Sequence, residues 1–111
     1  MAEPQPQLDY AANLEKYTST VDPAAVQGIV KYLGIALQNR DSSLVAAGDP
    51  AELTRVRDSF MKQKLGLTQS DAELDAALKD LMTKMSGERN KSRVTVYYLL
   101  AARFGKLGLF T

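Results

Sequence analysis

The sequence predicts an all-α fold: a compact, single-domain bundle of five main helices with one short additional helical turn. Apolar residues recur at spacings of three and four along several stretches, the period of a helix with one buried face. Good N-cap residues precede these stretches, twice as an Asp-Pro pair. The connections are two to six residues long, as in helical bundles, and 111 residues leave room for one domain.

The chain is expected to begin with a tail. Residues 1–7 contain two prolines and two glutamines and offer little to bury, so they predict a disordered segment. The helical domain is then expected over residues 8–111. A short first helix is predicted over about residues 9–17, where Leu14 and Tyr17 lie three positions apart on one side.

A strong helix start lies at Asp22 and Pro23. Asp accepts hydrogen bonds from the free N–H groups of a first turn, and Pro at the first helical position lacks only a donor that would stay unpaired. The helix is expected over about residues 23–38. Gly28 and Gly34 lower its propensity, so it should depend on tertiary packing, and they let a neighbouring segment approach closely.

The middle of the chain repeats this start signal. Residues 44–47 are expected to form one short helical turn closed by Gly48. Asp49 and Pro50 then start a helix over about residues 50–64. Its expected buried face carries Leu53, Val56 and Phe60.

The clearest amphipathic helix is expected over about residues 70–86. Ser70 and Glu73 form a capping box, in which each side chain accepts a hydrogen bond from the other residue's backbone. The apolar stripe that follows consists of Leu74, Leu78, Leu81 and Met85, with Ala77 and Met82 beside it.

The last element is rich in residues that favour strands, from Val94 to Tyr98. Nothing else in the chain resembles a partner strand, so we predict a helix over about residues 92–104. Because this helix is apolar almost all round, it should be either the central helix or a dimer contact. The apolar residues Leu107, Leu109 and Phe110 follow it and must dock on this chain or on a second copy.

Composition excludes several kinds of chemistry. The chain has no Cys, His or Trp, which removes disulfides, thiolate nucleophiles, imidazole acid–base catalysis and the usual zinc sites. We therefore expect neither catalysis nor a cofactor or metal. The longest apolar run, Val96–Ala102, has seven residues, far short of the roughly 20 that cross a bilayer, and the first 20 residues carry no signal-peptide pattern. The expected location is the cytoplasm, with no membrane partner.

Charge is unevenly divided along the chain. Residues 1–54 hold three basic and seven acidic side chains, whereas residues 55–111 hold eleven basic and six acidic ones. A basic half can indicate an anionic partner such as RNA. The simpler interpretation, favoured by a net charge of only +1, is that the halves fold against each other or dimerise.

The most basic stretch is a candidate anion-binding site. Arg89, Lys91 and Arg93 lie within five residues, next to the predicted start of the last helix, where free N–H groups also favour anions. They predict a contact to phosphate or an RNA backbone, with Arg55 and Arg57 as further candidates. The alternative is a solvated turn whose cations pair with Asp or Glu elsewhere in the fold.

A second candidate is a polar run that joins an acid–base dipeptide to two hydroxyl groups. Its residues are Arg40, Asp41, Ser42 and Ser43. The run can form a small polar binding site. The structural alternative, favoured by its residue types, is a turn with N-capping hydrogen bonds.

Several segments resemble a known family. They are Gly34–Val45, Asp49–Asp58, Lys64–Thr68, Lys91–Thr95 and Tyr97–Ala101. Together they resemble a family of short bacterial proteins that is catalogued only as a domain of unknown function and has a multihelical fold. The resemblance implies a helical fold and a helical last segment. It implies no activity, cofactor or catalytic residue.

These observations predict a small cytoplasmic interaction protein without catalytic activity, forming a homodimer and binding a protein partner that the sequence does not identify. The alternative is a protein that binds an anion or an RNA backbone through Arg89–Arg93. A third option is an enzyme restricted to the chemistry of Asp, Glu, Lys, Arg, Ser, Thr and Tyr.

Overall fold

The computed structural model describes residues 10, 12–38, 43–88 and 91–111. Helices dominate it, so the predicted all-α class is confirmed apart from one very short two-stranded sheet. In chain order the elements are a helical turn at Tyr10 and residues 12–14, α2 (Pro23–Leu33), the 3₁₀ turn η1 (Gly34–Gln38), β1 (Leu44–Val45), α3 (Pro50–Arg55), the π-helix η2 (Val56–Lys64), α4 (Asp71–Lys84), β2 (Lys91–Ser92), α5 (Arg93–Arg103) and the 3₁₀ turn η3 (Leu107–Leu109).

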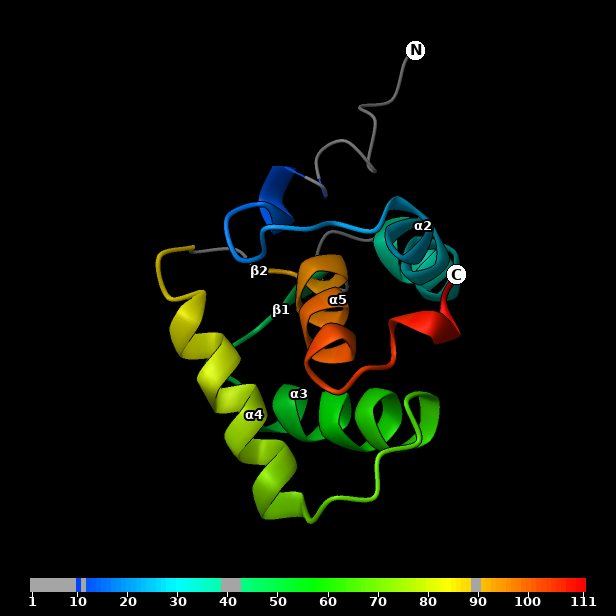
Figure 1. Cartoon of the computed structure of the whole chain (residues 1–111). Coiled ribbons are helices and arrows are strands. Elements are labelled where there is room, and N and C mark those ends of the chain that lie inside the picture. Colours follow the sequence, from blue (N-terminus) through cyan, green and yellow to red (C-terminus); the bar gives the residue numbers. More distant parts are fainter. Residues whose placement is uncertain (1–9, 11, 39–42, 89–90) are drawn as a thin grey trace.

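Helix α5 lies at the centre of the molecule, with α2 on one side, α4 on the other and α3 across one end (Figure 1). Seven of its eleven residues are buried. The helix predicted over residues 92–104 is therefore confirmed. We expected so apolar a helix either at the centre of the fold or at a dimer contact, and α5 lies at the centre (Figure 1).

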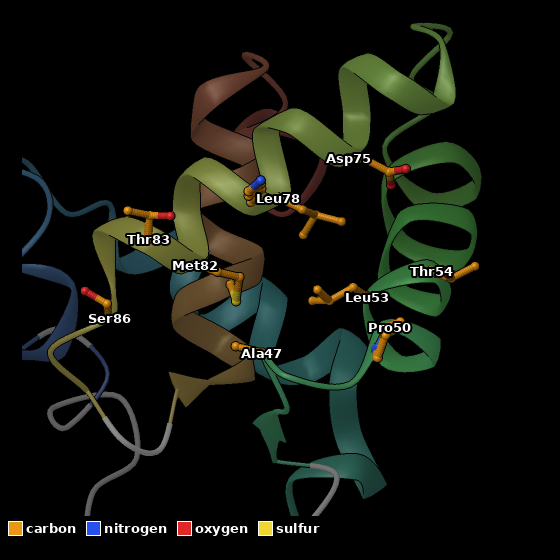
Figure 2. Close-up of a pocket in the computed structure, with 10 residues that line it drawn as sticks. Ala47, Pro50, Leu53, Thr54, Asp75, Leu78, Met82, Thr83 and Ser86 are labelled. Atoms are coloured by element: carbon orange, nitrogen blue, oxygen red, sulfur yellow. The ribbon is translucent and has the colours of Figure 1, made fainter.

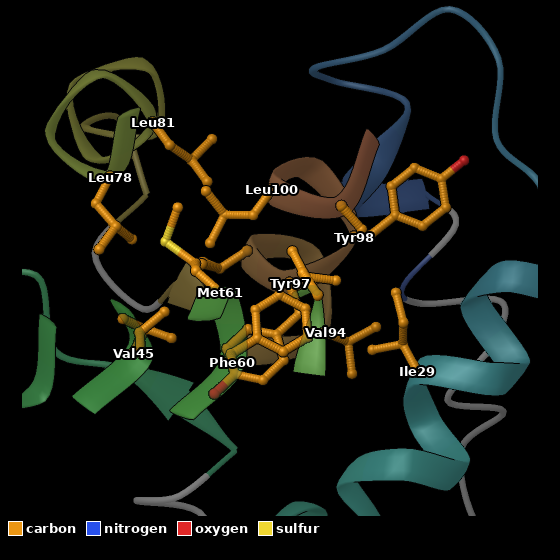
Figure 3. Packing of buried hydrophobic residues seen from close by; sticks show 14 of the residues in the cluster. Ile29, Val45, Phe60, Met61, Leu78, Leu81, Val94, Tyr97, Tyr98 and Leu100 are labelled. Atoms are coloured by element: carbon orange, nitrogen blue, oxygen red, sulfur yellow. The ribbon is translucent and has the colours of Figure 1, made fainter. Parts of the chain in front are cut away.

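The core forms where the other helices meet α5. The ring of Phe60 in η2 stacks on the ring of Tyr97 in α5, with centroids 3.8 Å apart. Around this pair, Figure 3 shows Ile29 from α2, Met61 from η2, Leu78 and Leu81 from α4, and Val94 and Leu100 from α5. Most of the predicted apolar stripes thus face one common core.

The apolar C-terminal tail docks on the chain's own core. Phe110 is buried, and its ring lies 6.2 Å from that of Phe60 and 6.0 Å from that of Tyr32. The backbone of Phe110 approaches α2 so closely that a Cβ at Gly28 would lie 1.9 Å from the Phe110 carbonyl oxygen. The close approach predicted at Gly28 is confirmed, and its neighbour is the tail.

The helical turn predicted over residues 44–47 is wrong. Leu44 and Val45 form β1, which pairs antiparallel with Ser92 and Lys91 of β2. The pairing satisfies backbone groups immediately before α5, and the Arg93 N–H continues it by donating to the Ser43 carbonyl at 2.9 Å. No partner strand was recognised because each strand is only two residues long and carries no alternating pattern.

Two other predicted helices differ from the structure in form. Helix α2 ends at Leu33 rather than residue 38, because Gly34 takes a φ of +48°, which ends the α-helix, and a 3₁₀ turn follows. The helix predicted over residues 50–64 has that extent, but from Val56 onward it is a π-helix. The Leu65 N–H accordingly donates to the Phe60 carbonyl, five residues back, at 2.9 Å.

Helix α4 matches the prediction most closely. It begins after Ser70 with both hydrogen bonds of the capping box and ends at Lys84, close to the predicted residue 86. The predicted tail, residues 1–7, lies outside the described residues. In the part of the chain that the structure describes, no helix combines the length and the apolar character needed to cross a membrane.

Candidate functional site

A groove of about 520 Å³ lies between α3 and α4. Figure 2 shows α3 on one side, α4 on the other and Ala47 of the β1–α3 connection at one end. The lining residues are Ala47, Pro50, Leu53, Thr54, Asp75, Leu78, Lys79, Met82, Thr83 and Ser86. This volume falls in the range of about 300–1,000 Å³ that is typical of ligand sites.

The groove has an apolar floor and a polar rim. Leu53 from α3 and Leu78 and Met82 from α4 extend into the space between the helices (Figure 2). Leu78 and Met82 are buried, and Leu53 is half-buried. The polar lining residues, including Thr54 and Thr83, are exposed. The site can therefore surround an apolar group with groups that stay in contact with water.

Local sequence signals position both walls of the groove. The Asp49 carboxylate caps α3 by accepting a hydrogen bond from the Ala51 N–H at 3.0 Å. On α4, Leu78 and Met82 are four residues apart, so they form one stripe. The neighbouring edge of α4 carries three polar residues that are also four positions apart: Asp75, Lys79 and Thr83.

Next to the groove, Arg57 gathers three carboxylates. It lies 2.9 Å from Asp58, 3.6 Å from Asp71 and 3.1 Å from Asp75, and it joins η2 to α4. The Arg57 hydrogen bond holds the pKa of Asp58 below its usual range, and the Lys62 hydrogen bond does the same for Asp71. Across the described ranges, no group of three or more Asp or Glu side chains is placed to hold a metal ion.

A largely buried ion pair joins Glu52 of α3 to Arg93 of α5. Arg93 donates hydrogen bonds to the Glu52 carboxylate, to the Leu44 carbonyl at 3.0 Å and to the Tyr97 hydroxyl at 3.1 Å. Burial disfavours the charged form of Arg93, but the Glu52 and Tyr97 contacts outweigh it and raise the pKa. Glu52 also accepts from the exposed Arg55 at 2.8 Å. The pair thus joins α3, β1 and α5.

The predicted anion-binding cations are already engaged by the protein where the structure describes them. Lys91 is buried and donates to the Glu88 carbonyl at 2.7 Å, and Arg93 is held as described above. Arg55 pairs with Glu52, and Arg57 with three carboxylates. Arg89 lies outside the described residues. An anion at this stretch would have to compete with these internal acceptors, and anion binding stays a prediction.

A second polar network joins the first helical turn and Tyr17 to Glu88 and to Thr95 of α5. Asn13 donates to the Glu88 carboxylate at 2.7 Å and accepts from the Thr95 hydroxyl at 2.5 Å. The Tyr17 hydroxyl also donates to Glu88. Burial, followed by this hydrogen bond and the Glu88 charge, raises the pKa of Tyr17 to about 12. The sequence analysis did not anticipate this network, because each of these hydrogen bonds joins residues more than 70 positions apart.

The family described as "Protein of unknown function (DUF2853)" matches residues 9–108, which is most of the chain. The chain belongs to this family. The resemblance inferred from the sequence to a family of unknown function is thus confirmed. The match spans α2 to α5, so both walls of the groove lie within it. No curated protein matches the chain.

The predicted polar site is described only in part in this DUF2853 member. Arg40, Asp41 and Ser42 lie outside the described residues. Ser43 is half-buried, and its carbonyl accepts the Arg93 N–H at 2.9 Å. That bond extends the pairing of β1 with β2, so it tests neither the polar site nor the N-capping turn, and both stay predictions.

The groove of this DUF2853 member is absent from the candidates drawn from the sequence. Leu53, Leu78 and Met82 were assigned to the core by their helical spacing. Two of them are indeed buried, yet all three also line the groove. No signal in a single sequence separates the two roles, because the groove depends on how far apart α3 and α4 pack.

Proposed function

We propose that the protein is a non-catalytic interaction protein whose α3–α4 groove receives an apolar side chain of a partner protein. The observation that carries this proposal is the apolar floor of Leu53, Leu78 and Met82 inside a polar rim. Protein interfaces commonly place one or two apolar anchors in such a pocket and surround them with polar contacts that exclude water.

The test blocks the groove without touching its buried floor. Thr54 and Thr83 line it from opposite walls and are exposed, so the double variant Thr54→Arg/Thr83→Arg fills the entrance. Peptides are selected from a random displayed library on the natural protein, and their affinities are measured by fluorescence anisotropy. We expect the selected peptides to contain an apolar anchor and to bind the blocked variant at least about tenfold more weakly.

The matched control carries the same added charge elsewhere. Ser59 and Thr68 are exposed and do not line the groove, so Ser59→Arg/Thr68→Arg should keep the natural affinity within about twofold. Circular dichroism of both variants checks that the helices persist. Selected peptides that bind the blocked variant as tightly as the natural protein would show that they bind elsewhere, and the proposal would fail.

A homodimer is the second candidate, favoured by a different surface. Among the described residues the exposed large apolar side chains are Tyr32, Ile35 and Leu109, and Ile35 is 81% exposed. Tyr32 contacts the ring of Phe110, the residue that follows Leu109 in the chain. Of the features that suggest a dimer in the sequence, most of α5 and Phe110 are buried within one chain, whereas Leu107 is half-buried and Leu109 is exposed. The support for a dimer therefore now comes from this surface.

Light scattering at about 50 μM protein tests the dimer. We expect a dimer mass for the natural chain at low and high salt, because an apolar contact is insensitive to screening. The variant Ile35→Asp should give a monomer, whereas Ile35→Val should not. A monomer mass for the natural chain contradicts this candidate.

We further propose that the protein acts in the cytoplasm. A chain without Cys gains no disulfide from an oxidising compartment, which supports this placement. Cell fractionation with an antibody to the protein tests it, and recovery outside the cytoplasmic fraction would contradict it.

A further inference from the structure

The carboxylates around the groove are each bound within the fold. Asp49 caps the N-terminus of α3, and Glu52 is held between Arg55 and Arg93. Asp75 lies on the rim itself and accepts two hydrogen bonds from Arg57, at 3.1 and 3.2 Å. Each of these carboxylates therefore already has a hydrogen-bonding partner within the chain.

Lys79 is a charged residue on the rim that, unlike these carboxylates, has no partner among the described residues. It is exposed, and the structure gives it no hydrogen bond or ion pair with any described residue. It lies one helical turn from both Asp75 and Thr83, on the edge of α4 beside the floor residues Leu78 and Met82. The uncommitted charge at the groove is therefore positive and lies next to its apolar floor.

We infer that the partner segment is an acidic amphipathic helix. One of its apolar side chains enters the groove, and an Asp or Glu three or four positions away pairs with Lys79. The lining residues on α4 run from Asp75 to Thr83, about 12 Å, which matches about two turns of a helix lying alongside. This inference rests on the proposed function, because it assumes that the groove is a docking site for a protein.

The experiment repeats the peptide selection on a charge-reversed protein. One random displayed library is panned on the natural chain, on Lys79→Glu and on Lys31→Glu. Lys31 is exposed on α2 and outside the groove, so its variant has the same change in net charge. We expect peptides from the natural chain and from Lys31→Glu to be enriched in Asp or Glu three or four positions from the anchor. Peptides from Lys79→Glu should instead carry Lys or Arg there.

Affinities of the acidic peptides then test the pair itself. Lys79→Gln should weaken binding about two- to fivefold, the usual range for an exposed ion pair. Rising salt should weaken binding to the natural chain more than binding to Lys79→Gln, because salt screens exposed charges. Exchanging the peptide's Glu for Lys should restore its affinity for Lys79→Glu.

The outcomes separate the two proposals. If the peptides need an open groove, as Thr54→Arg/Thr83→Arg reports, but show no acidic preference and tolerate Lys79→Glu, the acidic partner is wrong and the docking groove stands. If the peptides ignore the blocked groove, the proposed function fails, and with it this inference. Acidic enrichment on the natural chain that inverts on Lys79→Glu supports both.

Discussion

Among the charged residues, Arg93 shows most clearly how position decides chemistry. Its neighbours in sequence, Arg89 and Lys91, suggested an exposed basic patch. Its neighbours in space are the Glu52 carboxylate, the Leu44 carbonyl and the Tyr97 hydroxyl. Because Glu52 lies 41 positions away, local sequence cannot reveal the pairing. A charge in this environment needs its partner, because water no longer solvates it fully.

The first prediction concerns that partner. Glu52→Gln keeps the size of the side chain but leaves Arg93 without a counterion, so the free energy of unfolding should fall by about 3 kcal/mol. Arg55→Gln removes the exposed partner of the same carboxylate and should cost at most about 1 kcal/mol. Urea unfolding of both variants is the measurement. Equal losses in the two would contradict the assignment of Arg93 as the buried partner.

The second prediction concerns Tyr17, whose pKa is raised to about 12 from an ordinary value of 10.0. A raised pKa means that the fold favours the neutral phenol. The stability that this preference contributes is complete below pH 10 and is lost as the pH rises towards 12. The natural protein should therefore lose free energy of unfolding across this window more steeply than Tyr17→Phe. Urea unfolding of both proteins at several alkaline pH values tests this, and parallel curves would contradict it.

Among the elements, the helices with clear start signals were the most predictable. Ser70 with Glu73 located α4, and Asp22 with Pro23 located the start of α2. The prediction for residues 44–47 is wrong because their structure depends on a distant partner, Lys91–Ser92, rather than on their own helical propensity. The π-helical form of Val56–Lys64 was also missed. Its apolar residues recur much as in an α-helix, so their spacing does not distinguish the two forms.

The third prediction concerns the contact between α2 and the C-terminal tail. Gly28→Ala would place a methyl group within 1.9 Å of the Phe110 carbonyl oxygen, so backbone has to move. We expect a loss of about 1–3 kcal/mol in the free energy of unfolding, as for other overpacked sites. Gly48→Ala meets nothing within 4 Å and is the control, with an effect within about 0.5 kcal/mol. Thermal unfolding of both variants decides, and equal melting temperatures would contradict this docking of Phe110.

At the scale of the whole molecule, only a few ion pairs among the described residues join the acidic half, residues 1–54, to the basic half, residues 55–111. Glu52 of the acidic half binds Arg55 and Arg93 of the basic half. Most of the other ion pairs seen in the described ranges lie within residues 55–111, chiefly those of Arg57 and Lys62 with nearby carboxylates. The expectation that opposite halves attract is thus supported at one buried pair. The groove could not be foreseen, because it depends on the spacing of two helices and on which carboxylates are already bound.

The fourth prediction is the acid response of the whole fold. The pKa values of Asp58 and Asp71 are lowered in the folded state, so their contribution to stability is present above the ordinary Asp pKa of 3.8 and is lost as the pH falls below it. Urea unfolding should show stability falling between about pH 5 and pH 2. Arg57→Met should flatten that fall, whereas Arg103→Met, which removes only an exposed pair with Asp80, should not. An unchanged pH profile in Arg57→Met would contradict the role of the network.

The central position of α5 has a consequence for how the protein is made. Protein synthesis proceeds from the N-terminus at about 5–20 residues per second, so residues 93–110 emerge after every other described helix. Until then, α2, η2 and α4 lack the surface on which their apolar sides pack. The apolar sides of α2, η2 and α4 that pack on α5 therefore stay uncovered until α5 has been synthesised. Ribosome-associated chaperones would meet an open bundle, and collapse would follow the arrival of α5.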